Sequence, residues 1–315
     1  MKGLVLKSTG SWYEVLVKEE NKTYSSRLAG KLKLNKSDLT NPIAVGDYVQ
    51  IEKEDDRYAI IKAIEKRKNY IVRQSPKNKH QLHLIAANID LAILITTLKE
   101  PGFKQGFIDR FLITTEPQDI PVLIIFNKAD LYGQEELKTF RQLKTIYEKI
   151  GYKVMLISCE NGEGIEEMKK EILGKVSLIS GQSGVGKSSL LNSLIPEANK
   201  KTSEISNYSG KGIHTTTFAE MIIMNTNTFI IDTPGIKTLS FNNLQVMDVV
   251  HNFREFFKYS DLCRFGRNCT HRDEPNCEVK NAIESGDIYL YRYQNYLNIL
   301  DEIESQNHWE RKKEY

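Results

Sequence analysis

One stretch of the sequence has the residues and spacing of a phosphate-binding loop. Residues 181–188 read Gly-Gln-Ser-Gly-Val-Gly-Lys-Ser, which fits the Gly-x-x-x-x-Gly-Lys-Ser pattern in full. The glycines allow backbone N–H groups to surround phosphates at the start of a helix. Lys187 should reach the β- and γ-phosphates, and Ser188 should ligate Mg²⁺. We expect nucleotide contacts from Gly181, Gln182, Ser183, Gly184, Val185, Gly186, Lys187, Ser188 and Ser189.

A second motif offers a carboxylate to the same metal ion. Residues 232–235 read Asp-Thr-Pro-Gly and end an apolar run. The Asp232 carboxylate is placed to hold Mg²⁺ through water, and the Gly235 N–H to contact the γ-phosphate. Asp-x-x-Gly is a common turn by itself, but beside a phosphate loop it predicts a nucleoside triphosphatase.

A third motif predicts the base. Residues 127–130 read Asn-Lys-Ala-Asp and end another apolar run. The Asp130 carboxylate can accept hydrogen bonds from guanine N1–H and N2–H₂, which adenine cannot supply. The stem of Lys128 can pack along the purine, and Asn127 can brace the loops. Alone, the tetrapeptide could be a strand-end turn; in this context it favours GTP. Two residues after the next apolar run are expected near the base: Ser158 and Cys159.

Three of the four cysteines lie with a histidine inside 15 residues. Three thiolates and one imidazole form a closed tetrahedral set, which suits structural zinc because no ligand position remains for water. In a reducing cytoplasm this clustering favours metal over disulfide bonds. The spacing is not the common finger pattern, and the alternative is three incidental cysteines. The expected zinc ligands are Cys263, Cys269, His271 and Cys277.

Residues 1–70 predict a small OB-type β-barrel that precedes these motifs. Residues 1–80 hold 17 basic and 10 acidic residues, whereas the net charge of the whole chain is only +3. This asymmetry indicates a polyanionic partner such as RNA, and the alternative is a lysine-rich solvated face. Trp12 and Tyr13 could contact RNA or fill the barrel. Basic residues are expected in or beside its loops: Arg27, Lys31 and Lys33.

The rest of the chain divides into three parts. Residues 71–87 are polar, basic and interrupted by proline, which predicts a linker. Residues 88–240 alternate apolar strands with amphipathic helices, the pattern of a doubly wound α/β domain. Residues 241–315 predict a helical zinc-binding domain. Its expected helices are Val246–Tyr259, Glu278–Glu284 and Leu290–Ser305.

The order of the motifs is unusual. In ordinary GTPases the phosphate loop comes first and the base loops last, whereas here the base loops at 127 and 158 precede the phosphate loop at 181. This order indicates a circular permutation, which is possible because domain termini usually lie close together on the surface.

In this arrangement the chain resembles the ribosome small subunit-dependent GTPase A (RsgA) family over nearly its whole length. The resemblance includes residues 212–217, Gly-Ile-His-Thr-Thr-Thr, which are similar to the family's switch I; Ile213 replaces the usual basic residue. The resemblance implies an OB barrel, a permuted GTPase, a zinc-bearing C-terminal domain and a role in late assembly of the bacterial 30S subunit. The implied partners are the 30S subunit and its 16S rRNA.

Hydrolysis of GTP also needs a group that orients the attacking water and a second hydroxyl ligand for Mg²⁺. Ile236 occupies the position where Ras-like enzymes place a water-orienting glutamine. His214, beside the switch threonines, is the nearest candidate to position water, and the resemblance implies the same role; a solvated loop histidine is the alternative. Thr216 aligns best with the Mg²⁺-binding threonine of related GTPases, with Thr215 second. The expected Mg²⁺ ligands are therefore Ser188, Thr216 and Asp232.

The leading hypothesis is a ribosome-stimulated GTPase that binds the 30S subunit through its barrel and zinc domain and leaves after hydrolysis. One alternative is a GTP-regulated nucleic-acid-binding protein with negligible turnover, and another is a GTPase with a non-ribosomal target. No apolar run reaches the roughly 18 residues of a membrane helix. We therefore expect no membrane partner. The N-terminus lacks a signal-peptide pattern and the sequence shows no oligomerisation face, so we expect a cytoplasmic monomer.

Overall fold

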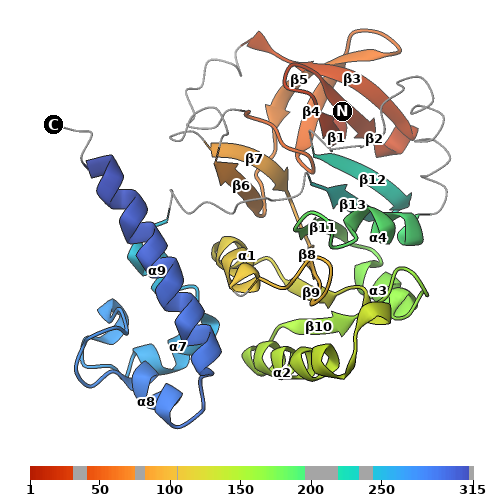
Figure 1. The fold of residues 1–315 in the computed structure, drawn as a ribbon. Helices are drawn as coiled ribbons and strands as arrows, with labels where there is room; N and C mark the ends of the chain where they lie inside the picture. Colours follow the sequence, from red (N-terminus) through yellow and green to blue (C-terminus); the bar gives the residue numbers. More distant parts are fainter. Residues whose placement is uncertain (31–40, 75–81, 105, 196–218, 234–243, 312–315) are drawn as a thin grey trace.

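The computed structural model describes residues 1–30, 41–74, 82–104, 106–195, 219–233 and 244–311 (Figure 1). Its three parts are a barrel at the N-terminus, an α/β domain in the middle and a helical C-terminal domain. This is the multidomain architecture expected from the sequence. Among the described residues, no helix combines the length and the apolar character that crossing a membrane needs.

The N-terminal barrel is closed by backbone pairing. Its strands follow the order β1-β2-β3-β5-β4, and β4 pairs back onto β1. Alternate side chains such as Val5, Val15 and Tyr24 are buried and fill the interior. The OB-type barrel is therefore confirmed. Its strands are β1 (Lys2–Ser8), β2 (Tyr13–Val17), β3 (Lys22–Leu28), β4 (Tyr48–Lys53) and β5 (Tyr58–Ile64).

The expectation of a linker at 71–87 was wrong. Two strands, β6 (Tyr70–Gln74) and β7 (Leu82–Ala87), pair antiparallel there as a separate two-stranded sheet. The buried side chains of Ile71, Leu84 and Ile85 join apolar clusters. The proline and most of the polar residues that suggested a linker fall between the strands, so composition averaged over the segment hid two short strands.

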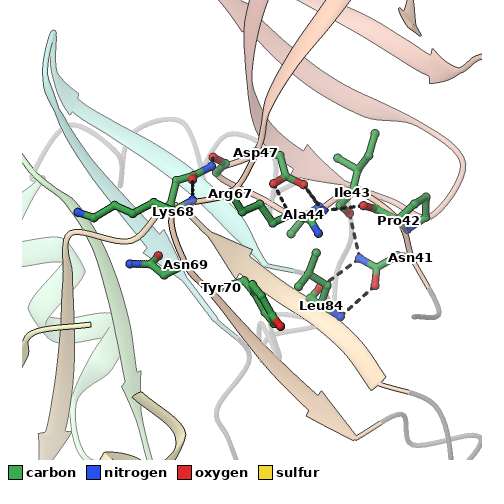
Figure 2. Close-up of polar contacts among 12 residues, drawn as sticks. Asn41, Pro42, Ile43, Ala44, Asp47, Arg67, Lys68, Asn69, Tyr70 and Leu84 are labelled. Carbon is green, nitrogen blue, oxygen red and sulfur yellow. Dashed lines mark hydrogen bonds and ion pairs between the residues drawn. The ribbon is translucent and has the colours of Figure 1, made fainter. Parts of the chain in front are cut away.

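A partly buried ion pair fixes the connection between the barrel and this hairpin (Figure 2). The Arg67 guanidinium donates to both carboxylate oxygens of Asp47, at 2.7 and 2.8 Å, and to the carbonyl oxygen of Pro42 at 2.6 Å. Asn41 donates to the carbonyl of Leu84 at 3.1 Å and accepts from its N–H at 3.1 Å. These side-chain bonds make the barrel and hairpin one connected unit.

The central domain has a six-stranded sheet covered by helices on both faces. Strands β10, β9, β8, β11 and β13 run parallel in that order, and β12 pairs antiparallel with β13. Helices α1 and α2 bury their apolar sides on one face, and α3 and α4 on the other, which confirms the doubly wound arrangement. The strands are β8 (Leu91–Thr96), β9 (Val122–Phe126), β10 (Lys153–Leu156), β11 (Val176–Gly181), β12 (Glu220–Asn225) and β13 (Thr228–Asp232). The helices are α1 (Phe107–Thr115), α2 (Gln134–Ile150), α3 (Ile165–Ile172) and α4 (Lys187–Leu194).

The barrel and the central sheet share an edge. Strand β1 pairs antiparallel with β12 at Lys7 and Glu220, whose side chains also form an ion pair at 3.2 Å. The barrel strands and the central strands therefore form one continuous sheet of eleven strands.

The C-terminal domain is helical, as expected, but the single helix expected at Val246–Tyr259 is two helices. Phe253 has extended backbone angles, φ −93° and ψ 98°, and its buried ring packs on Phe256 and Tyr296. The sequence predicted one helix because the apolar residues of both helices face the same core, so their spacing continues through the bend. The helices are α6 (Val246–Val250), α7 (Arg254–Ser260), α8 (Glu278–Glu284) and α9 (Leu290–Arg311).

A buried charge network docks this domain onto α1 and α2. The Arg292 guanidinium on α9 donates to Asp109 of α1 and pairs with both carboxylate oxygens of Glu255 on α7, at 2.6 and 3.0 Å. Asp109 also accepts from Tyr147 of α2 at 2.6 Å and from Asn295 of α9 at 2.5 Å. Three helices from two domains therefore meet at the Asp109 carboxylate, and Arg292 connects this group to a fourth helix, α7.

Candidate nucleotide site and metal centre

The sheet brings the nucleotide motifs to one edge. Because β8, β9, β10, β11 and β13 are parallel, their carboxyl ends lie at the same edge. The base loops follow β9 and β10, the phosphate loop follows β11, and Asp232 ends β13. Residues far apart in the sequence are thereby brought to the same edge of the sheet.

Two glycines of the phosphate loop are required by close approaches. A Cβ atom at Gly181 would lie 2.4 Å from the carbonyl oxygen of Ile95 in β8. Gly186 has φ +97°, and a Cβ there would lie 2.2 Å from Nδ2 of Asn127. The loop then enters α4 at Lys187, so its backbone has the strand–loop–helix context of a phosphate site.

The ammonium group of Lys187 lies inside the phosphate loop. It donates to the carbonyl oxygens of Gly181 at 2.8 Å and Gln182 at 2.6 Å. Burial lowers the pKa of Lys187, and the carboxylate of Asp232 opposes this shift. Next to Asp232, Thr233 donates its hydroxyl to the carbonyl of Ile179 at 2.9 Å, which fixes the end of β13 beside β11.

Asn127 connects three loops. Its side-chain N–H donates to the carbonyl of Val185 in the phosphate loop at 2.9 Å, and its side-chain oxygen accepts from the N–H of Cys159 at 3.2 Å. The Ser158 hydroxyl donates to the carboxylate of Asp130 and accepts from the N–H of Glu160 at 3.2 Å. The sequence-predicted base residues are thus brought together, and the Asp130 carboxylate is oriented by a second loop.

Cys159 is a neutral thiol at this site. Burial raises its pKa to about 11, while a hydrogen bond from Asn127 opposes the shift. A protonated thiol beside the base loop offers an apolar surface rather than a charge.

Sequence reasoning missed one side chain that holds the first base loop, residues 127–132, which we call the guanine loop. The Tyr132 hydroxyl donates to the carbonyl of Asn127 at 2.9 Å and accepts from the N–H of Leu98 at 2.8 Å. The Lys128 ammonium donates to the carbonyl of Glu100 in the same β8–α1 loop. No spacing rule signals the contacts to Leu98 and Glu100, because these partners lie about thirty residues away and are brought near only by the sheet topology.

The cysteine and histidine residues converge as expected. The four candidate ligand atoms of Cys263, Cys269, His271 and Cys277 lie within 4.8 Å of one another, and all four residues are buried. His271 Nδ1 lies 3.7 Å from the sulfur of Cys263 and 3.4 Å from that of Cys277. A tetrahedral site with Zn–S bonds of about 2.3 Å places its sulfurs roughly 3.8 Å apart, so this group could hold a zinc ion.

The hydrogen bonds around His271 suit this role. The Ser260 hydroxyl donates to the carbonyl of Phe256 at 2.9 Å, so it accepts from Nε2–H of His271 at 3.1 Å. The proton on Nε2 leaves a lone pair on Nδ1, the nitrogen that faces the sulfurs. Burial also lowers the pKa of His271 to about 4, which keeps the imidazole neutral. The donor set therefore fits a structural metal.

Two family models match the chain. The RsgA N-terminal domain matches residues 2–61, and the RsgA GTPase matches residues 64–242. The chain belongs to the RsgA GTPase family.

Relatives within the family align over nearly the whole chain. The small ribosomal subunit biogenesis GTPase RsgA of Phocaeicola vulgatus is 47% identical, and that of Bacteroides fragilis is 45% identical; each alignment covers 96% of this chain and 97% of the relative. YjeQ from Thermotoga maritima is a structural match with TM-score 0.77 and 32% identity, covering 96% of this chain and 98% of that chain. YloQ, described as a circularly permuted GTPase, matches with TM-score 0.75 and 30% identity, covering 97% of this chain and 95% of that chain.

The permutation expected from the motif order of this RsgA-family chain is confirmed by its topology. The phosphate-loop strand β11 is central, between β8 and β13, although it follows β8, β9 and β10 in the sequence. The expected switch and hydrolysis residues lie outside the described residues: His214, Thr215, Thr216, Gly235 and Ile236.

The structure distinguishes Trp12 from Tyr13, two aromatic residues that could contact RNA or fill the barrel. Tyr13 is buried in the barrel core. Trp12 and Tyr58 are each 43% exposed, and their ring centroids lie 5.7 Å apart. Arg27 lies in β3 and pairs with Glu54 at 2.9 Å, whereas Lys31 and Lys33 lie outside the described residues.

Proposed function

We propose that the protein hydrolyses GTP during late maturation of the small ribosomal subunit. The observation that carries this proposal is that the Asn127 side chain donates to the phosphate loop and accepts from the second base loop, which joins these three loops. Relatives that align with 96% of the chain are named for small-subunit biogenesis, which supports the ribosomal part.

GTP would lie along the edge of the sheet. Asp130 accepts from guanine N1–H and N2–H₂, while the stem of Lys128 covers the purine and Ser158 and Cys159 border the base. Lys187 exchanges its two carbonyl partners for phosphate oxygens. The remaining phosphate contacts come from Gly181, Gln182, Ser183, Gly184, Val185, Gly186, Ser188, Ser189 and Gly235.

A magnesium ion bound by Ser188, Thr216 and Asp232 would neutralise charge on the β- and γ-phosphates. His214 would orient the attacking water, because the glutamine of Ras-like enzymes is replaced by Ile236. An imidazole can accept a proton from water near neutral pH. The zinc held by Cys263, Cys269, His271 and Cys277 would be structural, since no ligand position is left for water.

The proposed partners are the 30S subunit and its 16S rRNA, bound by the barrel and the zinc domain of a cytoplasmic monomer. The exposed Trp12–Tyr58 pair can stack on unpaired bases, which contributes about 1–3 kcal/mol per base. The segment after β13 leads directly into the zinc domain, so GTP and GDP states would differ in 30S affinity. Equal affinity with GDP and a non-hydrolysable GTP analogue would contradict nucleotide-controlled release. We place the domain boundaries near residues 70 and 240.

The decisive experiment measures phosphate release from GTP with and without purified 30S subunits, for the natural protein and His214→Ala. We expect 30S to stimulate release and the variant to lose that stimulation. Stimulation that survives the substitution would keep the partner and reject His214. Negligible turnover with 30S, together with intact RNA binding, would favour a GTP-regulated RNA-binding protein.

A further inference from the structure

The side chain of Tyr132 closes the guanine loop into a ring. The loop leaves β9 at Asn127 and passes through a short 3-10 helix, Ala129–Leu131, after which Tyr132 folds back. Its backbone N–H donates to the carbonyl of Ala129 at 3.0 Å, and its hydroxyl donates to the carbonyl of Asn127 at 2.9 Å. The first and last residues of the loop are therefore tied through one phenol.

The same hydroxyl fixes the loop to its neighbour. It accepts from the N–H of Leu98 at 2.8 Å, and Leu98 directly follows the end of β8 by two residues. Desolvation in this half-buried position raises the pKa of Tyr132, so the hydroxyl keeps its proton. The bond that the hydroxyl donates closes the guanine loop, and the bond that it accepts from Leu98 anchors the loop to the β8–α1 loop.

The carbonyl that receives this bond belongs to the peptide unit before Lys128. Lys128 has φ +67°, in the left-handed region that non-glycine residues seldom adopt. Such a conformation persists only where its surroundings enforce it. Holding the Asn127 carbonyl prevents the peptide from rotating, and this φ angle directs the Lys128 ammonium to the carbonyl of Glu100.

We propose that Tyr132 is a positioning residue for guanine binding, which acts by holding Lys128 in its left-handed conformation over the base. This inference rests on the guanine-binding role proposed above for residues 127–130. Without the hydroxyl, the peptide can turn and the Lys128 stem leaves the base plane. Guanine nucleotides should then bind more weakly, while the hydrolysis step, which takes place at the phosphates, should be unaffected.

The test is Tyr132→Phe, which removes only the hydroxyl. We expect the Kd for GDP to rise about tenfold, a size typical of losing the hydrogen bonds of one hydroxyl group, and kcat at saturating GTP to stay within about twofold. Tyr152→Phe is the matched control, because its hydroxyl also donates to a protein oxygen, Glu116 Oε1 at 2.9 Å, but remote from the loop. Tyr152→Phe should leave the Kd unchanged.

A double-mutant cycle distinguishes positioning from general loosening. In a Lys128→Ala background, Tyr132→Phe should change the Kd for GDP by less than about twofold, because the group it positions is gone. A natural Kd in Tyr132→Phe, or a tenfold effect that persists without Lys128, would overturn the proposal.

Two further measurements complete the test. Hydrogen exchange of the Leu98 amide in the natural protein should slow when GDP binds, and equal rates would count against the proposal without any variant. Asp130→Asn should lose GDP and gain xanthosine diphosphate, because an amide can donate to the C2 carbonyl of xanthine. If Asp130→Asn changes neither affinity, the guanine assignment itself fails. If Asp130→Asn exchanges GDP for xanthosine diphosphate as expected but Tyr132→Phe leaves the Kd for GDP unchanged, only the proposed role of Tyr132 is wrong.

Discussion

Gly186 lies directly against Asn127 of the guanine loop, so the absence of a side chain at this position matters for space as well as for backbone freedom. Gly186→Ala would add a Cβ atom 2.2 Å from Asn127 Nδ2 at φ +97°. We expect Asn127 to be displaced and the Kd for GDP to rise at least about tenfold, measured by titration with a fluorescent GDP analogue. The left-handed backbone would also cost roughly 1–2 kcal/mol of stability.

Gly174→Ala separates these two effects. Gly174 also has a positive φ, +74°, but a Cβ there would meet nothing within 4 Å. This control should lower the melting temperature by a similar amount and leave GDP affinity unchanged. Equal GDP affinities in the two variants would show that the Asn127 contact is unimportant.

The thiol of Cys159 should react slowly at neutral pH. Burial raises its pKa to about 11, against about 8.5 for a free cysteine. Since the thiolate is the reactive form, alkylation at pH 8 should be roughly a hundredfold slower than in the urea-unfolded chain. The rate should keep rising up to about pH 11, as followed by mass spectrometry of the Cys159 peptide. A rate that levels off near pH 9 in the folded protein would contradict this environment.

At the scale of elements, the end of α7 supports the metal centre. Ser260→Ala would remove the acceptor for Nε2–H of His271 and release the imidazole to its other tautomer. Losing such a contact typically weakens metal binding 10–100-fold, measurable as faster zinc loss to a chromogenic chelator. Ser285→Ala removes a similar helix-end hydroxyl, whose possible acceptors are the Asp287 carboxylate at 3.0 Å and the carbonyl of Ala282 at 3.2 Å, and it should not change zinc loss. Matching rates for both variants would reject the role of Ser260.

The regular elements were predictable wherever burial has a clear period. The helix expected at Glu278–Glu284 coincides with α8, and the apolar run expected before Asn127 is strand β9. The hairpin β6–β7 was not predictable, because its polar connection dominates the composition of 71–87. The bend at Phe253 was also hidden, since α6 and α7 place their apolar residues on one core. Antiparallel β12 lacks a strong signal because its burial is interrupted along the strand.

At the scale of the whole molecule, Arg292 joins two domains. Arg292→Ala would leave the buried carboxylates of Asp109 and Glu255 without their shared cation. Breaking a buried pair typically costs about 3–5 kcal/mol, which urea unfolding would measure as a lower free energy of unfolding. Arg272→Ala is the matched control: its guanidinium also contacts both oxygens of a glutamate, Glu304, at 2.9 and 2.8 Å, but at the surface. We expect about 1 kcal/mol or less for this control, and similar losses in both would contradict the proposed docking.

In the candidate site, the residues of short sequence motifs could be predicted, whereas residues that act through distant partners could not. Phosphate-loop, guanine and zinc residues were identifiable because each motif encodes its own chemistry within a few positions. Tyr132, Ser260 and Arg292 act through partners brought near by tertiary packing, so their residue types alone indicated nothing. The network at Asp109 depends on α9, which lies more than 180 residues later in the sequence.

The position of β11 also sets an order of events during synthesis. Within the central domain, strands β8, β9 and β10 are synthesised before β11. Until β11 is made, the backbone edge of β8 that pairs with it has no partner strand. At roughly 5–20 residues per second, the ribosome needs about 4–17 s to make the chain between Thr96 and Gly181. The nascent domain therefore displays an open strand edge, Leu91–Thr96, throughout that interval. A protein engaged in building ribosomes would itself depend on steady translation to avoid pairing with the wrong chain.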